Sequence, residues 1–161
     1  VITDDTIVSM HEFKTRQYKQ LMDASMCPLR PGIREIIETS FEQGQKLALA
    51  TTTSRSNVET LLAATIGPDG MRMFSSVVAG DEVAHKKPAP DVYLKVLAEL
   101  GLAGPDCLAI EDSRNGLVSA MGAGIPVIVT PSFYSRDDDF AGALAIVKNF
   151  EDVGRISVSC I

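Results

Sequence analysis

Short apolar stretches alternate with longer amphipathic stretches along most of this 161-residue chain. A short apolar run bounded by turn residues is typical of a buried strand, whereas apolar residues recurring every three or four positions indicate a helix. This pattern predicts strands at 46–50, 74–79, 107–110, 126–130 and 144–147. It predicts helices from Ile33 to about Gly44, around 58–62, over 91–100 and around 117–121. Because strands that alternate with helices form βαβ units, the expected fold class is α/β with a parallel sheet.

A further helix is expected near the N-terminus. Thr3 is a suitable N-cap, and Asp4 and Asp5 suit the first turn of a helix. A loose apolar stripe follows, made of Ile7, Met10, Phe13, Tyr18 and Leu21. The segment Cys-Pro-Leu-Arg-Pro-Gly at 27–32 then indicates a linker, because Pro and Gly interrupt regular structure. We therefore expect this first helix to be separate from the α/β core.

The composition limits the possible partners and compartments. The formal net charge of −6 argues against nucleic acid or an anionic membrane as the main partner, because both attract a basic surface. No apolar run approaches the roughly 20 residues that a membrane helix needs. The three cysteines are far apart and form no CxxC motif, which favours reduced thiols. We expect a cytoplasmic protein, or an organelle stroma if a transit peptide was lost, and predict no oligomeric state.

Polar residues stand at the ends of the predicted strands. Thr51 follows the strand 46–50, and Glu111 and Asp112 follow the strand 107–110. Lys87 lies in the loop after the strand 74–79. Ligands of parallel α/β sheets bind at the carboxyl ends of the strands. We therefore expect these four side chains to lie close together at one edge of the sheet.

This combination of side chains suits a phosphate group and Mg²⁺. The Thr51 hydroxyl and the backbone N–H groups of Thr52 and Thr53, at a predicted helix start, would form an anion site. Lys87 adds a positive charge. The adjacent carboxylates of Glu111 and Asp112 would repel phosphate unless a hard cation lies between them, and Mg²⁺ binds carboxylate, phosphate and water oxygens. We therefore predict Mg²⁺ as the cofactor.

Each of these residues also has an ordinary structural explanation. A Thr after a strand often forms a cap or a turn, and an acidic pair before a helix suits the helix dipole. Arg55 and Asn57 are weaker candidates for substrate binding, because only their position after Thr51 favours that role. Asp81 and Glu82 are expected to be loop acids, with a supporting role beside the site as the alternative.

Three segments resemble the motifs of the haloacid dehalogenase-like (HAD) hydrolases. Motif II, a strand ending in Thr or Ser, is similar to LALATTTSRSN with Thr51. Motif III is similar to KKPAPDVYLKVL with Lys87, and motif IV to IEDSRNGLVSAMGAG with Glu111 and Asp112. The resemblance is closest to the branch of CbbY-like sugar-phosphate phosphatases, phosphoglycolate phosphatase and β-phosphoglucomutase. The segment TPSFYSRDDDFAGALAIV favours the CbbY-like members.

The resemblance extends from about residue 4 to residue 147 and implies a fold and a set of roles. The implied fold is a HAD-like, Rossmannoid parallel sheet sandwiched by helices. Thr51 and Lys87 would neutralise the charge that develops on phosphoryl oxygens. Asp112 would bind Mg²⁺ directly, and Glu111 directly or through water.

One family motif is absent from the sequence. Motif I, Asp-x-Asp-Gly-Thr, provides the phosphoryl-accepting nucleophile and the general acid/base in the family, and none occurs in these 161 residues. In this branch an α-helical cap lies between motifs I and II. We therefore expect residues 1–27 to be the last cap helix and a linker, and residues 28–161 to be a core without its central motif I strand. That strand would lie between 46–50 and 107–110. The expectation is a fragment or a truncated gene product.

The function implied is Mg²⁺-dependent hydrolysis of a small sugar phosphate or a similar phosphorylated metabolite. Two alternatives stay open, namely phosphoryl transfer as in β-phosphoglucomutase and a non-catalytic remnant that binds phosphate or Mg²⁺. A dinucleotide-binding enzyme is disfavoured, because no GxGxxG follows a first strand. Whether these residues form an enzyme by themselves stays open, since the covalent intermediate needs the nucleophile.

Overall fold

The computed structural model describes residues 28–151 together with Thr6, Ser9, Met10, Phe13 and Gln17. These five N-terminal residues are helical, as the capping and stripe pattern predicted for their positions. The rest of the predicted cap helix and its boundary at residue 27 lie outside the described residues, so this domain division stays a prediction. Within the described part, no helix is both long and apolar enough to cross a membrane.

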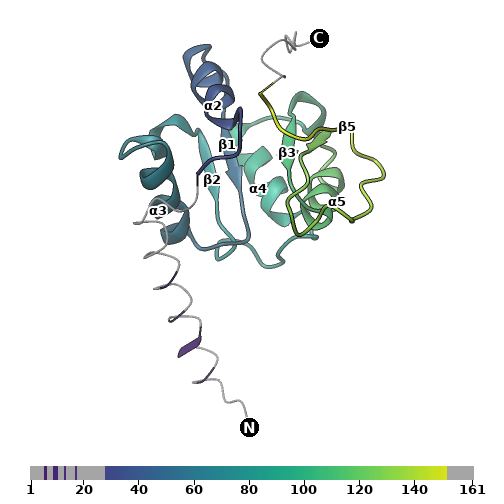
Figure 1. Ribbon diagram of the computed structural model, residues 1–161, viewed down its shortest axis with the longest axis horizontal. Coiled ribbons are helices and arrows are strands. Elements are labelled where there is room, and N and C mark those ends of the chain that lie inside the picture. Colours follow the sequence, from purple (N-terminus) through teal and green to yellow (C-terminus); the bar gives the residue numbers. More distant parts are fainter. Residues whose placement is uncertain (1–5, 7–8, 11–12, 14–16, 18–27, 152–161) are drawn as a thin grey trace.

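The described core has strands and helices in alternating order, as the pattern predicted (Figure 1). The strands are β1 (Ala48–Ala50), β2 (Ser76–Val78), β3 (Ala109–Glu111), β4 (Val127–Val129) and β5 (Ala145–Ile146). The helices are α2 (Ile33–Glu42), α3 (Arg55–Thr65), α4 (Asp91–Leu100) and α5 (Arg114–Gly122), with short 3-10 helices at Gly70–Met73 (η1) and Gly104–Asp106 (η2). Each strand is shorter than its apolar run.

The hydrogen-bond ladder explains the shift of β3 from its predicted range of 107–110. The N–H of Ala109 donates to the carbonyl oxygen of Pro126 at 2.9 Å, and the ladder starts there. The carbonyl oxygen of Glu111 accepts from the N–H of Thr130 at 2.8 Å, so that the strand includes Glu111. The apolar run therefore predicted that a strand is present here but not the residues at which it begins and ends.

The strands form two parallel sheets, β1–β2 and β3–β4–β5. Leu49 lies opposite Val77 in the first sheet, and Ile110 lies opposite Ile128 in the second. Among the described residues, no backbone hydrogen bond joins β1 to β3. The family resemblance places the motif I strand between these two strands, and the division into two sheets falls at that position.

Helices cover both faces of the β1–β2 sheet, because successive strand residues point to opposite faces. Leu49 and Val77 pack with Val58 of α3 on one face. Val78 packs with Val92 of α4 on the other face. The α/β sandwich that the alternating pattern and the resemblance implied is therefore confirmed here (Figure 1).

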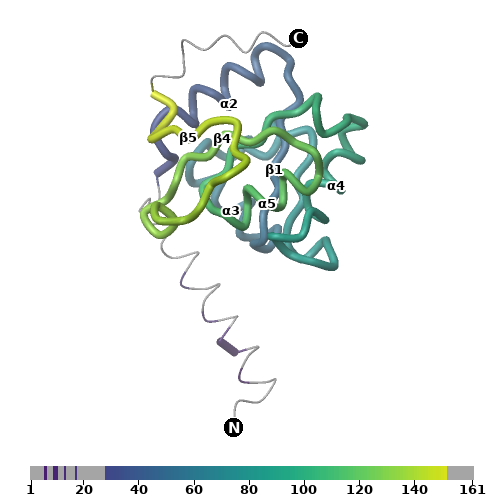
Figure 2. Tube along the Cα trace, turned by 90° about the vertical axis from the view of Figure 1, so that its right-hand side faces the viewer, coloured from purple at the N-terminus to yellow at the C-terminus, as the bar shows by residue number. Residues whose placement is uncertain are grey.

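One buried core connects the two sheets. The helix α4 packs on β1 and β2 and contacts α5, and α5 packs on β3 and β4. The buried side chains of Val92 on α4, Leu117 on α5 and Val127 on β4 belong to a single apolar cluster. Figure 2 shows α2 at the top of the molecule in this view, with α4, α5 and β1 below it. Packing of α4 against α5 therefore holds the sheets together where strand pairing does not.

The predicted linker is fixed to the C-terminal part of the core. The Arg30 guanidinium donates to the carbonyl oxygens of Thr130 at 2.5 Å and Pro131 at 2.8 Å. The N–H of Phe150 donates to the carbonyl oxygen of Pro31 at 3.1 Å. Phe150 itself is buried. The beginning and the end of the described core are thus held side by side.

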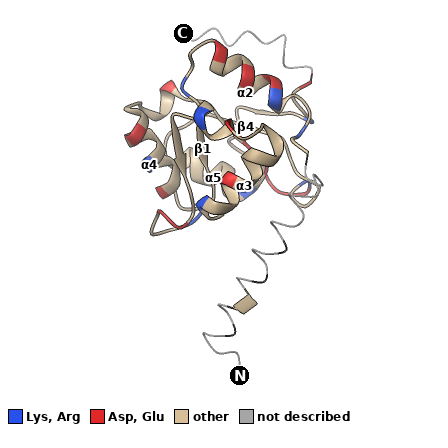
Figure 3. Ribbon diagram, turned by 90° about the vertical axis from the view of Figure 1, so that its left-hand side faces the viewer, with Lys and Arg blue, Asp and Glu red and all other residues tan. Residues whose placement is uncertain are grey.

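The helix α2 carries both signs of charge. Figure 3 shows acidic and basic positions along it, and Arg34 pairs with Glu38 at 3.1 Å. Both side chains are about half exposed, and pairs of this kind contribute little to stability. Arg34 is opposed by the three glutamates Glu35, Glu38 and Glu42, so this helix keeps an acidic surface.

The close approach of α5 to β3 depends on Gly116. A Cβ atom at this position would lie 1.8 Å from Oε2 of Glu111, so the helix can approach the strand end only with glycine there. The Ser113 hydroxyl caps α5 by accepting a hydrogen bond from the N–H of Gly116 at 3.3 Å. The short sequence from Glu111 to Gly116 thus combines a strand end, a helix cap and the space for a carboxylate.

We expect the 161-residue chain by itself to be marginally stable or to self-associate. No described strand pairs with the second edge of β1 or of β3, and Leu108 and Ile110 are 42% and 37% exposed. Unpaired strand edges beside apolar side chains favour association between chains. Thermal unfolding and light scattering of the purified chain test this. A monodisperse monomer with a sharp, cooperative transition would contradict it.

We expect Gly116→Ala to lower the free energy of unfolding by about 1–3 kcal/mol, because the added methyl group displaces the Glu111 carboxylate. In an exposed helix the same change would stabilise by about 1 kcal/mol. Gly122→Ala in the same helix is the matched control, since its Cβ would meet only the Pro90 side chain, at 3.3 Å. Urea unfolding of both variants measures the difference. The idea fails if Gly116→Ala is as stable as Gly122→Ala.

Candidate active site

The predicted site residues lie at the carboxyl ends of the strands. Thr51 directly follows β1, Lys87 lies in the loop between β2 and α4, and Glu111 ends β3 with Asp112 after it. Lys87 Nζ donates to the carbonyl oxygen of Ala50 at 2.9 Å and contacts Oε1 of Glu111 at 2.5 Å. The structure therefore brings Lys87 and Glu111 into contact beside the end of β1.

The Lys87–Glu111 pair is nearly buried, with side-chain exposures of 11% and 9%. The Tyr93 hydroxyl also donates to Oε1 of Glu111, and Lys87 Nζ lies 4.8 Å from the centre of the Tyr93 ring. Two donors on one carboxylate and an aromatic face beside the ammonium compensate for the burial of both charges. Lys87 thereby links β1 to β3, the two strands that do not pair.

Tyr93 is a site residue that the sequence did not identify. It lies on the buried face of α4 with Val96, Leu97 and Leu100. The available signal was a tyrosine at a buried helix position, because a buried phenol needs a partner for its hydroxyl group. Burial raises the pKa of Tyr93 far above its ordinary value, and the nearby Glu111 carboxylate raises it further. The hydroxyl group therefore stays protonated and remains a donor.

The loop that begins at Thr51 leads into α3. Thr51 Oγ1 accepts a hydrogen bond from the N–H of Thr53 at 3.2 Å, and the N–H of Thr51 donates to the carbonyl oxygen of Val78 at 3.1 Å. Thr52 is exposed, and in the described part of the chain its N–H has no hydrogen-bond partner. Of the two N–H groups expected in the anion site, that of Thr52 is open and that of Thr53 is engaged within the loop.

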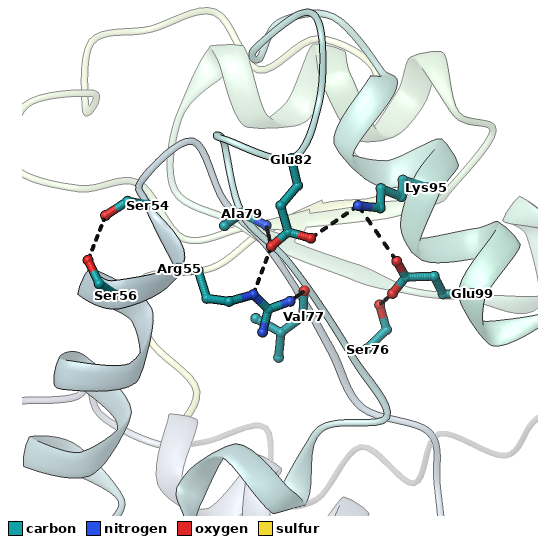
Figure 4. Close-up of polar contacts among 9 residues, drawn as sticks. All are labelled: Ser54, Arg55, Ser56, Ser76, Val77, Ala79, Glu82, Lys95 and Glu99. Atoms are coloured by element: carbon teal, nitrogen blue, oxygen red, sulfur yellow. Dashed lines mark hydrogen bonds and ion pairs between the residues drawn. The ribbon is translucent and has the colours of Figure 1, made fainter.

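Arg55 and Asn57, the two weaker candidates for substrate binding, contact protein groups. Arg55 Nε donates to Oε1 of Glu82 at 3.0 Å, and its Nη2 donates to the carbonyl oxygen of Val77 at 2.7 Å (Figure 4). Asn57 Nδ2 donates to Oγ1 of Thr53 at 3.1 Å. A contact of either residue with substrate stays a prediction.

The two acids of the motif IV segment differ in environment. Glu111 is buried and neutralised by Lys87, whereas Asp112 is exposed. The carbonyl oxygen of Asp112 accepts hydrogen bonds from the N–H of Ser132 at 3.2 Å and from the Ser135 hydroxyl. No side chain among the described residues bonds to its carboxylate. Backbone contacts therefore hold Asp112 in place while its carboxylate stays open.

The donor set at this edge fits Mg²⁺ when phosphate and water complete the coordination. Mg²⁺ is commonly held by one or two carboxylates together with phosphate oxygens and water. Lys87, Glu111 and Asp112 bring one positive and two negative charges, so a phosphate would be repelled without a divalent cation. The residues that the structure describes contain no group of three or more potential metal-ligating side chains. The roles of Glu111 and Asp112 as ligands stay predictions.

Comparisons with known proteins agree with the motifs. A family model described as haloacid dehalogenase-like hydrolase matches residues 2–130, which include all the predicted site residues. The chain is 48% identical over 141 residues to Protein CbbY of Rhodobacter capsulatus, covering 88% of this chain and 62% of that protein. It is 35% identical over 143 residues to a phosphorylated carbohydrates phosphatase of Thermotoga maritima, covering 86% of this chain and 62% of that protein.

The fold agrees as well. A crystal structure of a CbbY variant from Rhodobacter sphaeroides in complex with xylulose-(1,5)bisphosphate superposes with a TM-score of 0.88 at 43% identity. The match covers 92% of this chain and 66% of that chain. The chain thus spans less than two thirds of the length of these relatives. From the family match and the identities, the chain belongs to the haloacid dehalogenase-like hydrolases, and it has CbbY proteins among its relatives.

Proposed function

We propose that this chain supplies the phosphate-binding and metal-binding part of a phosphatase that acts on a small sugar phosphate. The observation that carries the proposal is the position of Lys87, whose ammonium contacts both the carbonyl oxygen of Ala50 at the end of β1 and Glu111 at the end of β3. The relatives support the substrate class, since one CbbY binds a xylulose bisphosphate and another relative is named for phosphorylated carbohydrates.

Lys87 and the loop at Thr51 would act by electrostatic stabilisation. Phosphoryl transfer places negative charge on the oxygens of the transferred group, and fixed donors stabilise this charge without rearranging. The Lys87 ammonium is already oriented by Ala50 and Glu111. The Thr51 hydroxyl and the N–H of Thr52 lie at the same strand end. Together they would bind the phosphoryl oxygens from one side.

Asp112 would be the main ligand of Mg²⁺, with Glu111 next to it. The Mg²⁺ ion would supply positive charge beside the phosphate and so relieve its repulsion by the two acids. Oε1 of Glu111 already accepts from Lys87 and Tyr93, and Oε2 lies against Gly116, so Glu111 would act on the ion mainly through its charge or a metal-bound water. Asp112 therefore has the larger expected effect on metal affinity.

The phosphoryl acceptor is the part of the reaction that these residues do not supply. The motif Asp-x-Asp-Gly-Thr does not occur in the sequence, and the family resemblance places its strand between β1 and β3, which belong to different sheets. We assign the nucleophile to a segment outside these 161 residues. The same absence favours the second candidate, a phosphate-binding or Mg²⁺-binding protein without catalysis, so activity must be measured with motif I present.

We expect the 161-residue chain to bind Mg²⁺ weakly, through a site that lacks its other ligands. Asp112→Asn should weaken the affinity by at least about tenfold, because it removes the open carboxylate. Titration of Mg²⁺ by NMR or calorimetry measures this. Asp69→Asn, which alters an exposed acid paired with Arg72, is the matched control and should bind as the unmodified chain does. Equal affinities of the unmodified chain and Asp112→Asn would rule out this site.

We expect the 161-residue chain alone to release negligible phosphate from sugar phosphates. With a motif I segment restored, Mg²⁺-dependent turnover should appear, and Lys87→Ala should lower kcat about 10²–10³-fold through lost charge stabilisation. Lys86→Ala changes the exposed neighbouring lysine and serves as the control. Phosphate release is the measurement. Robust turnover by the unextended chain would falsify the assignment of the nucleophile to a missing segment.

A further inference from the structure

The loop that carries Lys87 is fastened in its second half, where the N–H and Nδ1 of His85 contact Oδ2 of Asp91 and the Ser119 hydroxyl donates to the carbonyl oxygen of Ala89 at 2.6 Å. It runs between β2 and α4, and Asp81, Ala84, His85, Lys86 and Pro88 within it are exposed. Lys87 must nevertheless be held in one position, because its ammonium contacts Ala50 and Glu111 on different sheets. The position of Lys87 therefore depends on the anchoring of both halves of this loop, and the first half is the part next to the Thr51 loop.

The start of the loop lies directly on the Thr51 loop. The N–H of Gly80 donates to the carbonyl oxygen of Thr53 at 2.8 Å. A Cβ atom at Gly80 would lie 2.2 Å from the carbonyl oxygen of Thr52, so only glycine permits this backbone contact. The two loops that carry the predicted phosphate-binding groups are thus in contact before the chain reaches Lys87.

Glu82 follows two residues later and joins three elements. Its Oε1 accepts hydrogen bonds from Arg55 Nε at 3.0 Å and from the N–H of Ala79 at 3.3 Å. Its Oε2 accepts from Lys95 Nζ at 3.0 Å. Arg55 begins α3, Ala79 follows β2, and Lys95 lies in α4. Figure 4 shows the Glu82 carboxylate between the two cations.

The contacts of Glu82 continue along β2. The second donor of Arg55 reaches the carbonyl oxygen of Val77 at 2.7 Å, and Lys95 also lies 3.9 Å from Glu99. Glu99 accepts a hydrogen bond from the buried Ser76 hydroxyl at 2.7 Å. The pKa of Glu82 is lowered by its hydrogen bond to Lys95, with Arg55 and the N–H of Ala79 acting in the same direction against desolvation. Glu82 is therefore ionised at neutral pH.

We propose that Glu82 is a positioning residue that fixes the Lys87 loop against the Thr51 loop through Arg55 and Lys95. Its side chain is 24% exposed, and Arg55 and Lys95 are 43% and 37% exposed, so solvent screens these ion pairs and they contribute little to overall stability. We expect Glu82 to affect mainly the backbone position of the loop between Gly80 and Lys87. The role of this geometry in phosphate binding rests on the proposed function, whereas the anchoring of the loop does not.

Amide hydrogen exchange tests the anchoring. The amides of Gly80 and Ala89 are hydrogen-bonded and report on the loop, and the amide of Thr130 reports on the core. In Glu82→Gln we expect the two loop amides to exchange about tenfold faster relative to the Thr130 amide. A tenfold change corresponds to about 1.4 kcal/mol. Lys95→Gln, which leaves Arg55 in place, should show the same selectivity at about threefold. Glu38→Gln, which breaks the exposed pair on α2, should leave the ratio unchanged.

Two results would overturn the proposal on this readout. Unchanged exchange at Gly80 and Ala89 would show that Glu82 does not anchor the loop. Equal acceleration of these amides and of the Thr130 amide would show that Glu82 acts only on overall stability. Lys95→Gln keeps the test decisive if Glu82→Gln does not fold, because it removes only one of the two cations.

Inorganic phosphate, titrated with Mg²⁺ present, tests the consequence for the site. We expect Glu82→Gln to bind phosphate about tenfold more weakly than the unmodified chain, with Glu38→Gln as the control. Equal phosphate affinity of the unmodified chain and Glu82→Gln would overturn the positioning role. If the unmodified chain binds no phosphate, the proposed function fails, and the exchange ratio alone then supports or overturns the anchoring by Glu82.

Discussion

The burial of the Glu111 carboxylate is the constraint on which this structure depends. A charge at the end of a buried strand is costly unless donors surround it, and breaking such a pair by removing one partner costs about 3–5 kcal/mol. Lys87 and Tyr93 supply the donors, and Gly116 supplies the space. The loop after β2, the helices α4 and α5, and the strand β3 must therefore take their positions together.

The ion pairs of the core differ in what they do because they differ in exposure. The Lys87–Glu111 pair is nearly dry and links the two sheets. The pairs of Glu82 with Arg55 and Lys95 are partly exposed and join a loop to two helices. Screened ion pairs are sufficient to anchor the loop, because this requires a defined backbone position and only a small contribution to the free energy of unfolding.

Topology made the positions of the candidate site residues predictable from sequence, but it did not predict which side chains would bond to one another. Thr51, Lys87 and Glu111 could be placed at one edge because parallel strands align their carboxyl ends. Arg55 was a weaker candidate for substrate binding, and its observed partner Glu82, 27 positions further along the chain, could not be read from the local sequence. Tyr93 was missed for the same reason, since no local pattern shows which acid a buried phenol meets. The shift of β3 reflects a hydrogen-bond ladder that depends on the neighbouring strand.

The contact between Pro31 and Phe150 has a consequence for engineering. Chain ends that lie next to each other allow a core to be recut by circular permutation, with the old ends joined and new ones opened in an exposed loop. In a core cut to residues 28–151, the contacts of Arg30 and Phe150 would hold the two new ends together. A permutant opened among the exposed residues around Tyr134 would keep the pairing of β1 with β2 and of β3 with β4, because none of their hydrogen bonds passes through that loop. The packing of the strands and helices of this core therefore does not depend on the order in which they follow one another along the chain.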